Sequence, residues 1–348
     1  PLNFLIINFF IFTLFFLFLI KKKNQIDNKR LFFFYGWLFG FGYFLTNLYW
    51  ISISLSFDRN FEYLIPISIF LIPAFLAIFY GLASYLFVIF KTKKIIVSFL
   101  VFSLTFGIIE FLRGTIFTGF PWNLIAFSFS NQKEILSVIS LFGTYGFNLF
   151  CISLFTSPAI FFVRDSRKDM ILCIFFIIAI VTFYLSGISY KKEFNNSQKN
   201  ILDYKVRIIG SQISLDRFYS NIEPISVIKE LIELSNPDLN DKIIFIWPEG
   251  ILPGLSQKEL IEYNWLFSEN FNENHIFIIG VNSHSIKDKF KRYHNTLTVY
   301  DNKLKVIDYY NKIKLVPFGE FLPFEKFLNK IGLKTITNNF GSFTHGEK

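Results

Sequence analysis

The first half of the chain is a series of long apolar runs separated by short polar loops. About 20 apolar residues are enough for one helix to cross a bilayer. The pattern predicts six membrane spans: Leu2–Ile20, Leu31–Ile53, Tyr63–Phe90, Ile95–Leu112, Ile135–Val163 and Met170–Ile188. The third and fifth runs are long for a single crossing, so we expect each to tilt or to include an interfacial end. A buried helix of a soluble protein is an alternative for one run, but a poor one for six in series.

The pattern changes after the sixth run. Short β-branched runs alternate with helical stretches in the order 206–209, 225–234, 243–246, 260–270, 276–280, 296–300 and 306–309. Strands that alternate with helices and are followed by a hairpin predict a layered α/β domain. We therefore expect a transmembrane domain over residues 1–190, a hinge in the polar stretch Tyr190–Asn200, and a soluble domain over residues 191–348.

The charges of the loops predict the orientation. Short cytoplasmic loops collect Lys and Arg, and here every second loop is basic. The basic residues are Lys21, Lys22, Lys23, Lys29 and Arg30, then Lys91, Lys93 and Lys94, then Arg164, Arg167 and Lys168. Six spans then place everything after Ser189 on the extracytoplasmic side of the membrane.

Composition agrees with this division. Hydrophobic residues make up 52% of the chain, which contains 50 Phe among 348 residues, and the net charge is +9. Residues 1–190 hold 14 Lys and Arg against 7 Asp and Glu, so most of the excess positive charge belongs to the membrane loops. A nucleic-acid partner therefore has little support.

Glu249 is the first candidate for chemistry. It follows the apolar run Ile243–Ile246 and the pair Trp247-Pro248, which puts it at the carboxyl end of a probable central strand. Sites of α/β folds gather at such strand ends, and a general base partly desolvated by Trp247 would fit there. A solvated loop glutamate is the alternative.

Lys312 and Glu320 are the second candidate, on either side of a turn that contains Pro317, Phe318 and Gly319. A lysine beside a reacting carbonyl can stabilise an oxyanion. A surface lysine, like the nearby Lys314, is the alternative.

In the membrane half, Glu110 and Arg113 lie three residues apart near the end of the fourth span, before Gly119-Phe120-Pro121-Trp122. Ionisable residues at membrane depth are functional candidates, and the two could pair with each other or contact a lipid headgroup. The histidines show no metal-ligand spacing, and we predict no metal and no cofactor. Cys151 and Cys173 lie inside predicted spans, away from a soluble site.

Together these segments resemble the apolipoprotein N-acyltransferases, the membrane-embedded branch of the nitrilase (carbon–nitrogen hydrolase) superfamily. The resemblance is carried by an ordered set of motifs along the chain. These are 40–50 in the second span, Glu110-x-x-Arg113-Gly114 through Trp122, Trp247-Pro248-Glu249, Tyr293-x-Asn295-Thr296, Lys312 through Pro323, and Ser342-Phe343-Thr344-x-Gly346.

The resemblance implies a multi-pass helical membrane domain followed by a nitrilase-like αββα domain, and a Glu–Lys–Cys triad. Glu249 would be the general base, Lys312 would stabilise the tetrahedral intermediate, and Glu320 would support the site. A cysteine would take an acyl chain from a phospholipid and pass it to the N-terminal lipid-modified cysteine of an apolipoprotein, at the inner membrane. Substrate contacts would fall at Trp247, Phe218, Glu110, Arg113 and Trp122, with Phe218 where the family usually has a tryptophan.

The family's cysteine would lie beyond Lys348, so we expect a fragment that lacks both ends of the protein, and we expect residues 1–348 alone to be inactive. Three other functions stay open. The first is a membrane-tethered nitrilase-type amidase, and the second is a non-catalytic protein that binds lipid or lipoprotein. The third is a transporter. The spans argue against it because they lack a paired broken-helix pattern.

Overall fold

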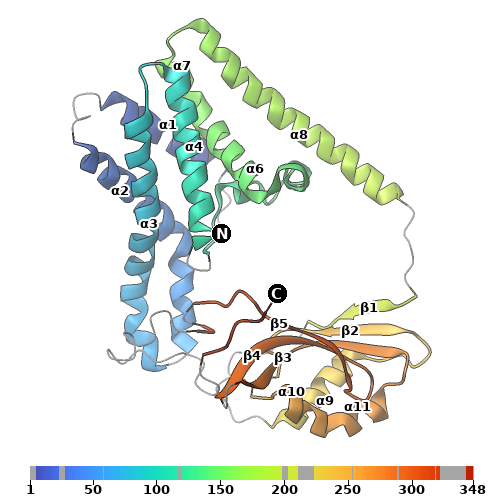
Figure 1. The fold of residues 1–348 in the computed structure, drawn as a ribbon. Coiled ribbons are helices and arrows are strands. Elements are labelled where there is room, and N and C mark those ends of the chain that lie inside the picture. The colour runs from blue at the N-terminus through green and yellow to red at the C-terminus, as the bar shows by residue number, and fades with distance from the viewer. Residues whose placement is uncertain are drawn as a thin grey trace. The chain divides into compact units, whose positions relative to one another are not determined.

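The computed structural model divides the chain into two compact units, residues 1–198 and 199–348. It describes residues 5–22, 28–57, 59–116, 119–197, 203–210, 223–252, 254–287, 290–317, 319–321 and 342–347. Each unit is described by itself below, and both are drawn in Figure 1.

Unit 1 is helical throughout its described part. Its α-helices are α1 (Leu5–Lys21), α2 (Lys29–Leu48), α3 (Ile65–Phe90), α4 (Ile95–Arg113), α5 (Lys133–Leu136), α6 (Ile139–Thr156), α7 (Ile160–Val163) and α8 (Met170–Asn196). Five helical stretches of the described residues are long and apolar enough to cross a membrane: 29–56, 62–90, 95–113, 139–163 and 167–196. The first predicted span corresponds to α1, which has 17 described residues.

The fifth predicted span is less regular than expected. The predicted run began at Ile135, but residues 133–136 form the separate short helix α5, and α6 is interrupted at Gly143 by non-helical dihedral angles (φ 70°, ψ 168°). A positive φ is adopted readily by glycine because it has no Cβ. The regular part of this span therefore follows Gly143, and the residues before it form an irregular end.

Phenylalanine fills the interior of unit 1. Phe12, Phe16, Phe99, Phe102 and Phe106 are each fully buried, and neighbouring rings meet edge to face, as Phe16 and Phe102 do with centroids 5.2 Å apart. Aromatic pairs of this geometry stabilise a core beyond the area that they bury. In contrast, α8 has three buried residues, Cys173, Phe176 and Gly187, and it packs on the other helices along one side, as Phe183 does against Phe150. Its remaining apolar surface is suited to lipid.

The basic loops of unit 1 gather at one end of the helices. Lys91 Nζ donates to Leu19 O at 3.4 Å, which places the loop after α3 at the carboxyl end of α1. Asp165 accepts from the Ile95 backbone N–H at 2.8 Å, which brings the loop after α7 to the start of α4. The structure therefore groups the loops that the charge pattern predicts to share one side of the membrane.

Unit 2 contains a mixed five-stranded sheet in the order β1-β2-β3-β4-β5. The strands are β1 (Lys205–Ile208), β2 (Ile243–Trp247), β3 (His275–Lys287), β4 (Phe290–Tyr300) and β5 (Val306–Asn311). The first three are parallel and the last two antiparallel to their neighbours. The helices α9 (Pro224–Ser235), α10 (Gln257–Leu260) and α11 (Asn264–Asn270) lie together on one face of this sheet (Figure 1).

The helix-covered face holds the core of unit 2. Side chains alternate across a strand, so Phe245, Trp247, Phe277 and Ile279 point to the helices and are buried. The other face carries a second apolar set, which includes Ile244, Ile246 and Ile278. Of these, Ile246 on β2 is paired with Ile278 on β3. The predicted alternation of strands and helices is confirmed. One sheet is present among the described residues, so the αββα sandwich stays a prediction.

The polar stretch Tyr190–Asn200, expected to be a hinge, is helical as far as Asn196, where α8 ends. The two units divide two residues further on.

Candidate functional site

Glu249, Lys312 and Glu320 meet in unit 2 although they come from different segments. Glu249 follows β2, Lys312 directly follows β5, and Glu320 lies in the loop after it. Strands β2 and β5 are not neighbours, because β3 and β4 lie between them. The chain after β2 therefore crosses over β3, and it does so at Gly280, where an added Cβ would lie 2.7 Å from Glu249 Cα.

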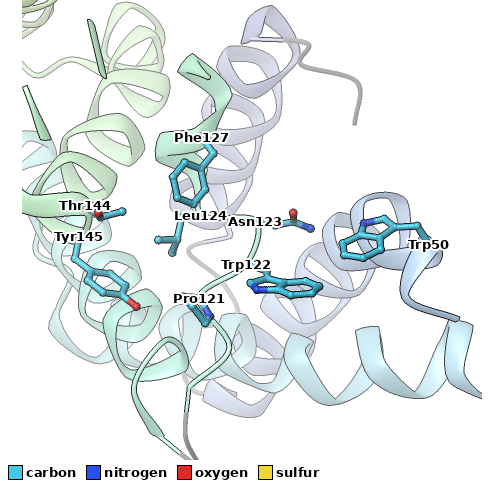
Figure 2. Close-up of a pocket in the computed structure, with 8 residues that line it drawn as sticks. All are labelled: Trp50, Pro121, Trp122, Asn123, Leu124, Phe127, Thr144 and Tyr145. Atoms are coloured by element: carbon cyan, nitrogen blue, oxygen red, sulfur yellow. The ribbon is translucent and has the colours of Figure 1, made fainter. Parts of the chain in front are cut away.

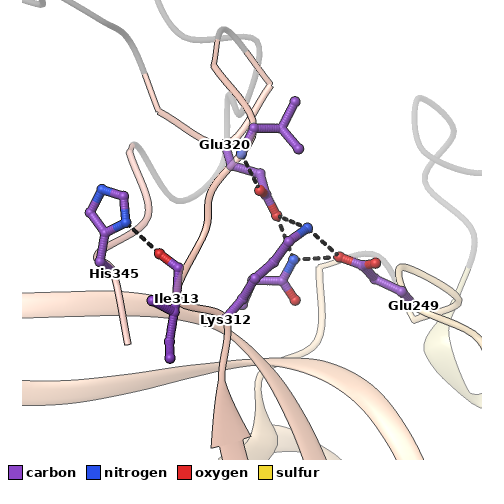
Figure 3. Close-up of polar contacts among 7 residues, drawn as sticks. Glu249, Lys312, Ile313, Glu320 and His345 are labelled. Carbon is purple, nitrogen blue, oxygen red and sulfur yellow. Dashed lines mark hydrogen bonds and ion pairs between the residues drawn. The ribbon is translucent and has the colours of Figure 1, made fainter. Parts of the chain in front are cut away.

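The lysine bridges the two carboxylates, as Figure 3 shows. Lys312 Nζ lies 2.9 Å from Glu320 Oε1 and 3.3 Å from Glu249 Oε1. The side chains differ in exposure: Glu320 is 12% exposed, Lys312 32% and Glu249 62%. Glu249 is thus the member of the group most open to a reacting molecule.

Glu320 is held by both of its oxygens. Oε1 accepts from Lys312, and Oε2 accepts from the Val316 backbone N–H at 2.6 Å. Partial burial raises the pKa of Glu320, but the hydrogen bonds from Lys312, the Val316 N–H and Asn295 outweigh it and hold the pKa below its usual value. A carboxylate bound in this way is a poor proton acceptor.

Glu249 has an uncommitted oxygen. Its Oε1 accepts from Lys312, and among the described residues its Oε2 accepts no hydrogen bond. The geometry therefore separates the two acids, since Glu249 can take a proton and Glu320 serves to anchor the lysine.

Lys312 remains a cation in this setting. Partial burial lowers its pKa, but hydrogen bonds and charge interactions with Glu320 and Glu249 raise the pKa above its ordinary value. An ammonium group has three donors, and two are directed at the carboxylates. The third has no acceptor among the described residues, and a developing oxyanion could accept from it.

The segment 342–347 is hydrogen bonded along the same edge. Thr344 N donates to Tyr293 O at 2.7 Å, and Gly346 N donates to Lys312 O at 2.9 Å. His345 Nδ1 pairs with Ile313 O at 2.7 Å (Figure 3). Two of these bonds hold the backbone at Lys312 and at the residue that follows it.

Trp247 does not lie where we expected it. Its side chain is 1% exposed, packs against Phe267 and Phe277, and donates from Nε1 to Ser235 Oγ at 3.0 Å. It follows Ile243 and Phe245 in the two-residue period of β2 and therefore faces the helices. We correct its role to that of a core residue, and it does not desolvate Glu249. Phe218 lies outside the described residues.

Glu110 and Arg113 in unit 1 pair with each other, which was one of the two expected arrangements. Both side chains are fully buried. Arg113 Nε donates to Glu110 Oε1 at 3.0 Å and Nη2 donates to Oε2 at 2.7 Å. Its remaining nitrogen, Nη1, donates to the carbonyls of Phe120 and Trp122 at 2.7 and 3.0 Å. The arginine therefore fastens the loop that carries Trp122 to the end of α4.

Trp122 lines an open pocket of about 510 Å³ (Figure 2). Its ring is stacked on Trp50, with centroids 5.1 Å apart and planes 15° from parallel. Figure 2 shows Tyr145 on the opposite side of the pocket, with Pro121 between. The pocket walls are mostly apolar and aromatic: Trp50, Pro121, Trp122, Asn123, Leu124, Phe127, Thr144 and Tyr145.

Sequence reasoning missed two contributors to the unit 2 site. Gly280 was taken as the end of a strand, and Asn295 was noted within Tyr293-x-Asn295-Thr296 without a role. The structure places Asn295 Nδ2 within hydrogen-bond distance of both Glu249 and Glu320. The available signal was an Asn followed by Thr in a strand, because a polar side chain on the face of a sheet needs a hydrogen-bond partner.

Known proteins resemble this chain along most of its length. Residues 1–157 match the family described as the apolipoprotein N-acyltransferase N-terminal domain. The chain is 29% identical over 326 residues to an apolipoprotein N-acyltransferase of Brucella melitensis biotype 1, covering 89% of this chain and 59% of that protein. It is 30% identical over 343 residues to one from Rickettsia prowazekii, covering 97% of this chain and 66% of that protein.

A third relative of the same description, from Rhodopseudomonas palustris, is 28% identical over 326 residues. The chain spans about 60% of the length of that relative. It is thus a relative of the apolipoprotein N-acyltransferases along most of its length, and its first 157 residues match their N-terminal domain.

Proposed function

We propose that the protein transfers an acyl chain from a phospholipid to the α-amine of the lipid-modified N-terminal cysteine of lipoproteins. The observation that carries the proposal is the ammonium of Lys312 held between two carboxylates, with one Glu249 oxygen that accepts no hydrogen bond from the described residues. This arrangement supplies a base and a fixed positive charge side by side, as acyl transfer requires. The names of the relatives supply the reaction class.

The proposed roles are those that the family resemblance implies, and the geometry of the site supports them. Glu249 accepts the proton of a cysteine thiol as the sulfur attacks the ester carbonyl of the phospholipid. Lys312 faces the oxyanion of the tetrahedral intermediate, which collapses to a thioester. The departing lysophospholipid oxygen takes the proton back from Glu249. In the second half, the lipoprotein amine attacks the thioester, Glu249 accepts the amine proton, and that proton returns to the departing thiolate.

The nucleophile is not supplied by the described residues. Cys151 and Cys173 lie in α6 and α8 of unit 1 and are both buried. We propose that neither serves, and that residues 1–348 without another cysteine do not form the thioester.

The helices of unit 1 provide the access to lipid that the proposed reaction requires. Five stretches long enough to span a membrane, and a pocket walled by Trp50, Trp122 and Tyr145, suit a site that must receive acyl chains. We propose that the basic loops face the cytoplasm and that unit 2 acts on the opposite, periplasmic side of the inner membrane. Aromatic residues such as Trp50 and Trp122 are common at membrane interfaces.

The test is an acylation assay on the full-length protein in membranes. The donor is a phospholipid with an isotope-labelled acyl chain, and the acceptor is a peptide with an N-terminal diacylglyceryl-cysteine. We expect the peptide mass to rise by one labelled chain. Lys312→Met should lower the rate by about 10²–10³-fold, the usual cost of losing an oxyanion donor. Lys314→Met is the matched control because Lys314 is exposed on the same loop.

Two outcomes would contradict the proposal. Hydrolysis of small amides without transfer from phospholipid would indicate an amidase. Binding of the lipopeptide without turnover, in wild type and variants alike, would indicate a non-catalytic lipoprotein-binding protein.

A further inference from the structure

Asn295 occupies the centre of the unit 2 site. It lies in β4, and its Nδ2 donates to Glu249 Oε1 at 2.5 Å and to Glu320 Oε1 at 2.6 Å. These are the same two oxygens that Lys312 Nζ approaches. Each of these two Oε1 atoms therefore accepts from one cationic donor and one neutral donor (Figure 3).

The charges explain why a neutral donor is needed. Two carboxylates share a single ammonium group, so the cluster carries one uncompensated negative charge. A second lysine would balance the charge but would compete with Lys312 for the anionic intermediate. An amide N–H₂ stabilises both ionised carboxylates through hydrogen bonds and adds no charge.

The backbone around Asn295 is hydrogen bonded within the sheet, whereas Glu249 lies outside the strands. The Asn295 carbonyl accepts from the Lys312 backbone N–H at 2.8 Å, and the adjacent Thr296 donates to Asn311 Oδ1 at 2.7 Å. Asn295 and Lys312 are thus fixed to each other by the β4–β5 pairing. Glu249 lies on an exposed turn beyond β2, and Asn295 provides the shorter of its two side-chain contacts.

We propose that Asn295 is a positioning residue that holds the Glu249 carboxylate beside Lys312 with its second oxygen open to the substrate. This inference rests on the proposed acyl transfer. It assigns Asn295 no contact with the reacting atoms, because both hydrogens of its amide are committed to the two carboxylates.

The experiment measures kcat and KM for acyl transfer in Asn295→Ala and Asn295→Asp. Loss of the hydrogen bond releases the Glu249 carboxylate from its position beside Lys312, so kcat should fall by about 10²-fold in Asn295→Ala with little change in KM, because a displaced catalytic group costs about that much. Asn295→Asp keeps the side-chain shape and adds a third negative charge, so kcat should fall further. Asn302→Ala, in the turn between β4 and β5, should leave both constants unchanged.

A second readout does not depend on turnover. With Glu249 released, the Lys312 ammonium loses part of its stabilisation, and its modification at pH 9 by an amine-reactive ester should increase several-fold relative to Lys314, as read by peptide mass spectrometry. A loss of activity that comes with lower thermal stability and unchanged labelling would mean a merely structural role and would overturn the inference. A wild-type protein that shows no acyl transfer, with the labelling increased in Asn295→Ala, would refute the proposed function while supporting the positioning role.

Discussion

Gly280 lies directly against the backbone of Glu249. A Cβ built on Gly280 would approach Glu249 Cα to 2.7 Å and the Glu249 backbone nitrogen to 3.3 Å. The strand β3 can carry the turn after β2 across its surface because there is no side chain at this position.

Gly280→Ala should therefore displace Glu249 and impair catalysis more than stability. A misplacement of about 1 Å at a catalytic group can cost about 10²-fold in rate, and we expect a loss of that order in kcat/KM. The unfolding temperature of the detergent-solubilised protein should change little, because the displaced turn is exposed. Gly210→Ala is the matched control, since an added Cβ there meets none of the described residues within 4 Å. Wild-type activity in Gly280→Ala would show that the position of Glu249 is not important.

Glu249→Gln and Glu320→Gln should fail in different ways. The first removes the proposed base and should lower acyl transfer by about 10²–10⁴-fold with little change in the unfolding temperature. The second keeps the base but weakens the anchor of Lys312 and the bond from the Val316 N–H. We expect Glu320→Gln to lose less activity than Glu249→Gln and to be less stable to heat. The reverse pattern would exchange the roles of the two acids.

The ion pair of α4 yields a prediction about stability. Arg113→Met leaves Glu110 buried without its partner, and breaking a buried pair from one side costs about 3–5 kcal/mol. The double variant Glu110→Gln/Arg113→Met removes both charges and should be more stable than Arg113→Met alone. Thermal unfolding of the three proteins in detergent measures this difference. Equal destabilisation by the single and double changes would mean that the bonds to Phe120 and Trp122, and not the paired charges, dominate.

The Lys312 cluster makes stability depend on pH at both extremes. The pKa of Glu320 is lowered from its ordinary value of 4.5, so its contribution is complete above that value and is lost as pH falls through the folded pKa. The pKa of Lys312 is raised from 10.5, so its contribution is complete below that value and is lost as pH rises through the folded pKa.

The difference in unfolding temperature between wild type and Lys312→Met should therefore be constant between about pH 5 and pH 10 and shrink outside that window. Unfolding monitored by circular dichroism across the range measures it. A difference that keeps changing through neutral pH would show that another group controls the coupling.

The sequence predicts the elements of this fold well wherever a periodic pattern decides them. The apolar runs of unit 1 and the strand-and-helix alternation of unit 2 are both observed. The fifth span was the exception, because the presence of a glycine such as Gly143 in an apolar run does not by itself predict a positive φ.

For the site, Glu249 and Lys312 could be proposed because each directly follows a strand. The role of Trp247 was misjudged, although the period of Ile243, Phe245 and Trp247 already placed its side chain on the covered face. The roles of Gly280 and Asn295 depend on register and on the path of the turn across β3, which local sequence does not determine.

The face of the unit 2 sheet that α9, α10 and α11 do not cover has a practical consequence. The parallel register aligns Ile244 with Val206 and Ile276, and aligns Ile246 with Ile208 and Ile278, into apolar rows that cross the strands. Val206 and Ile208 are 51% and 74% exposed. Flat apolar surfaces of this kind drive self-association in water. Unit 2 cut free for biophysical work would need detergent, or polar substitutions on these rows, to remain monomeric.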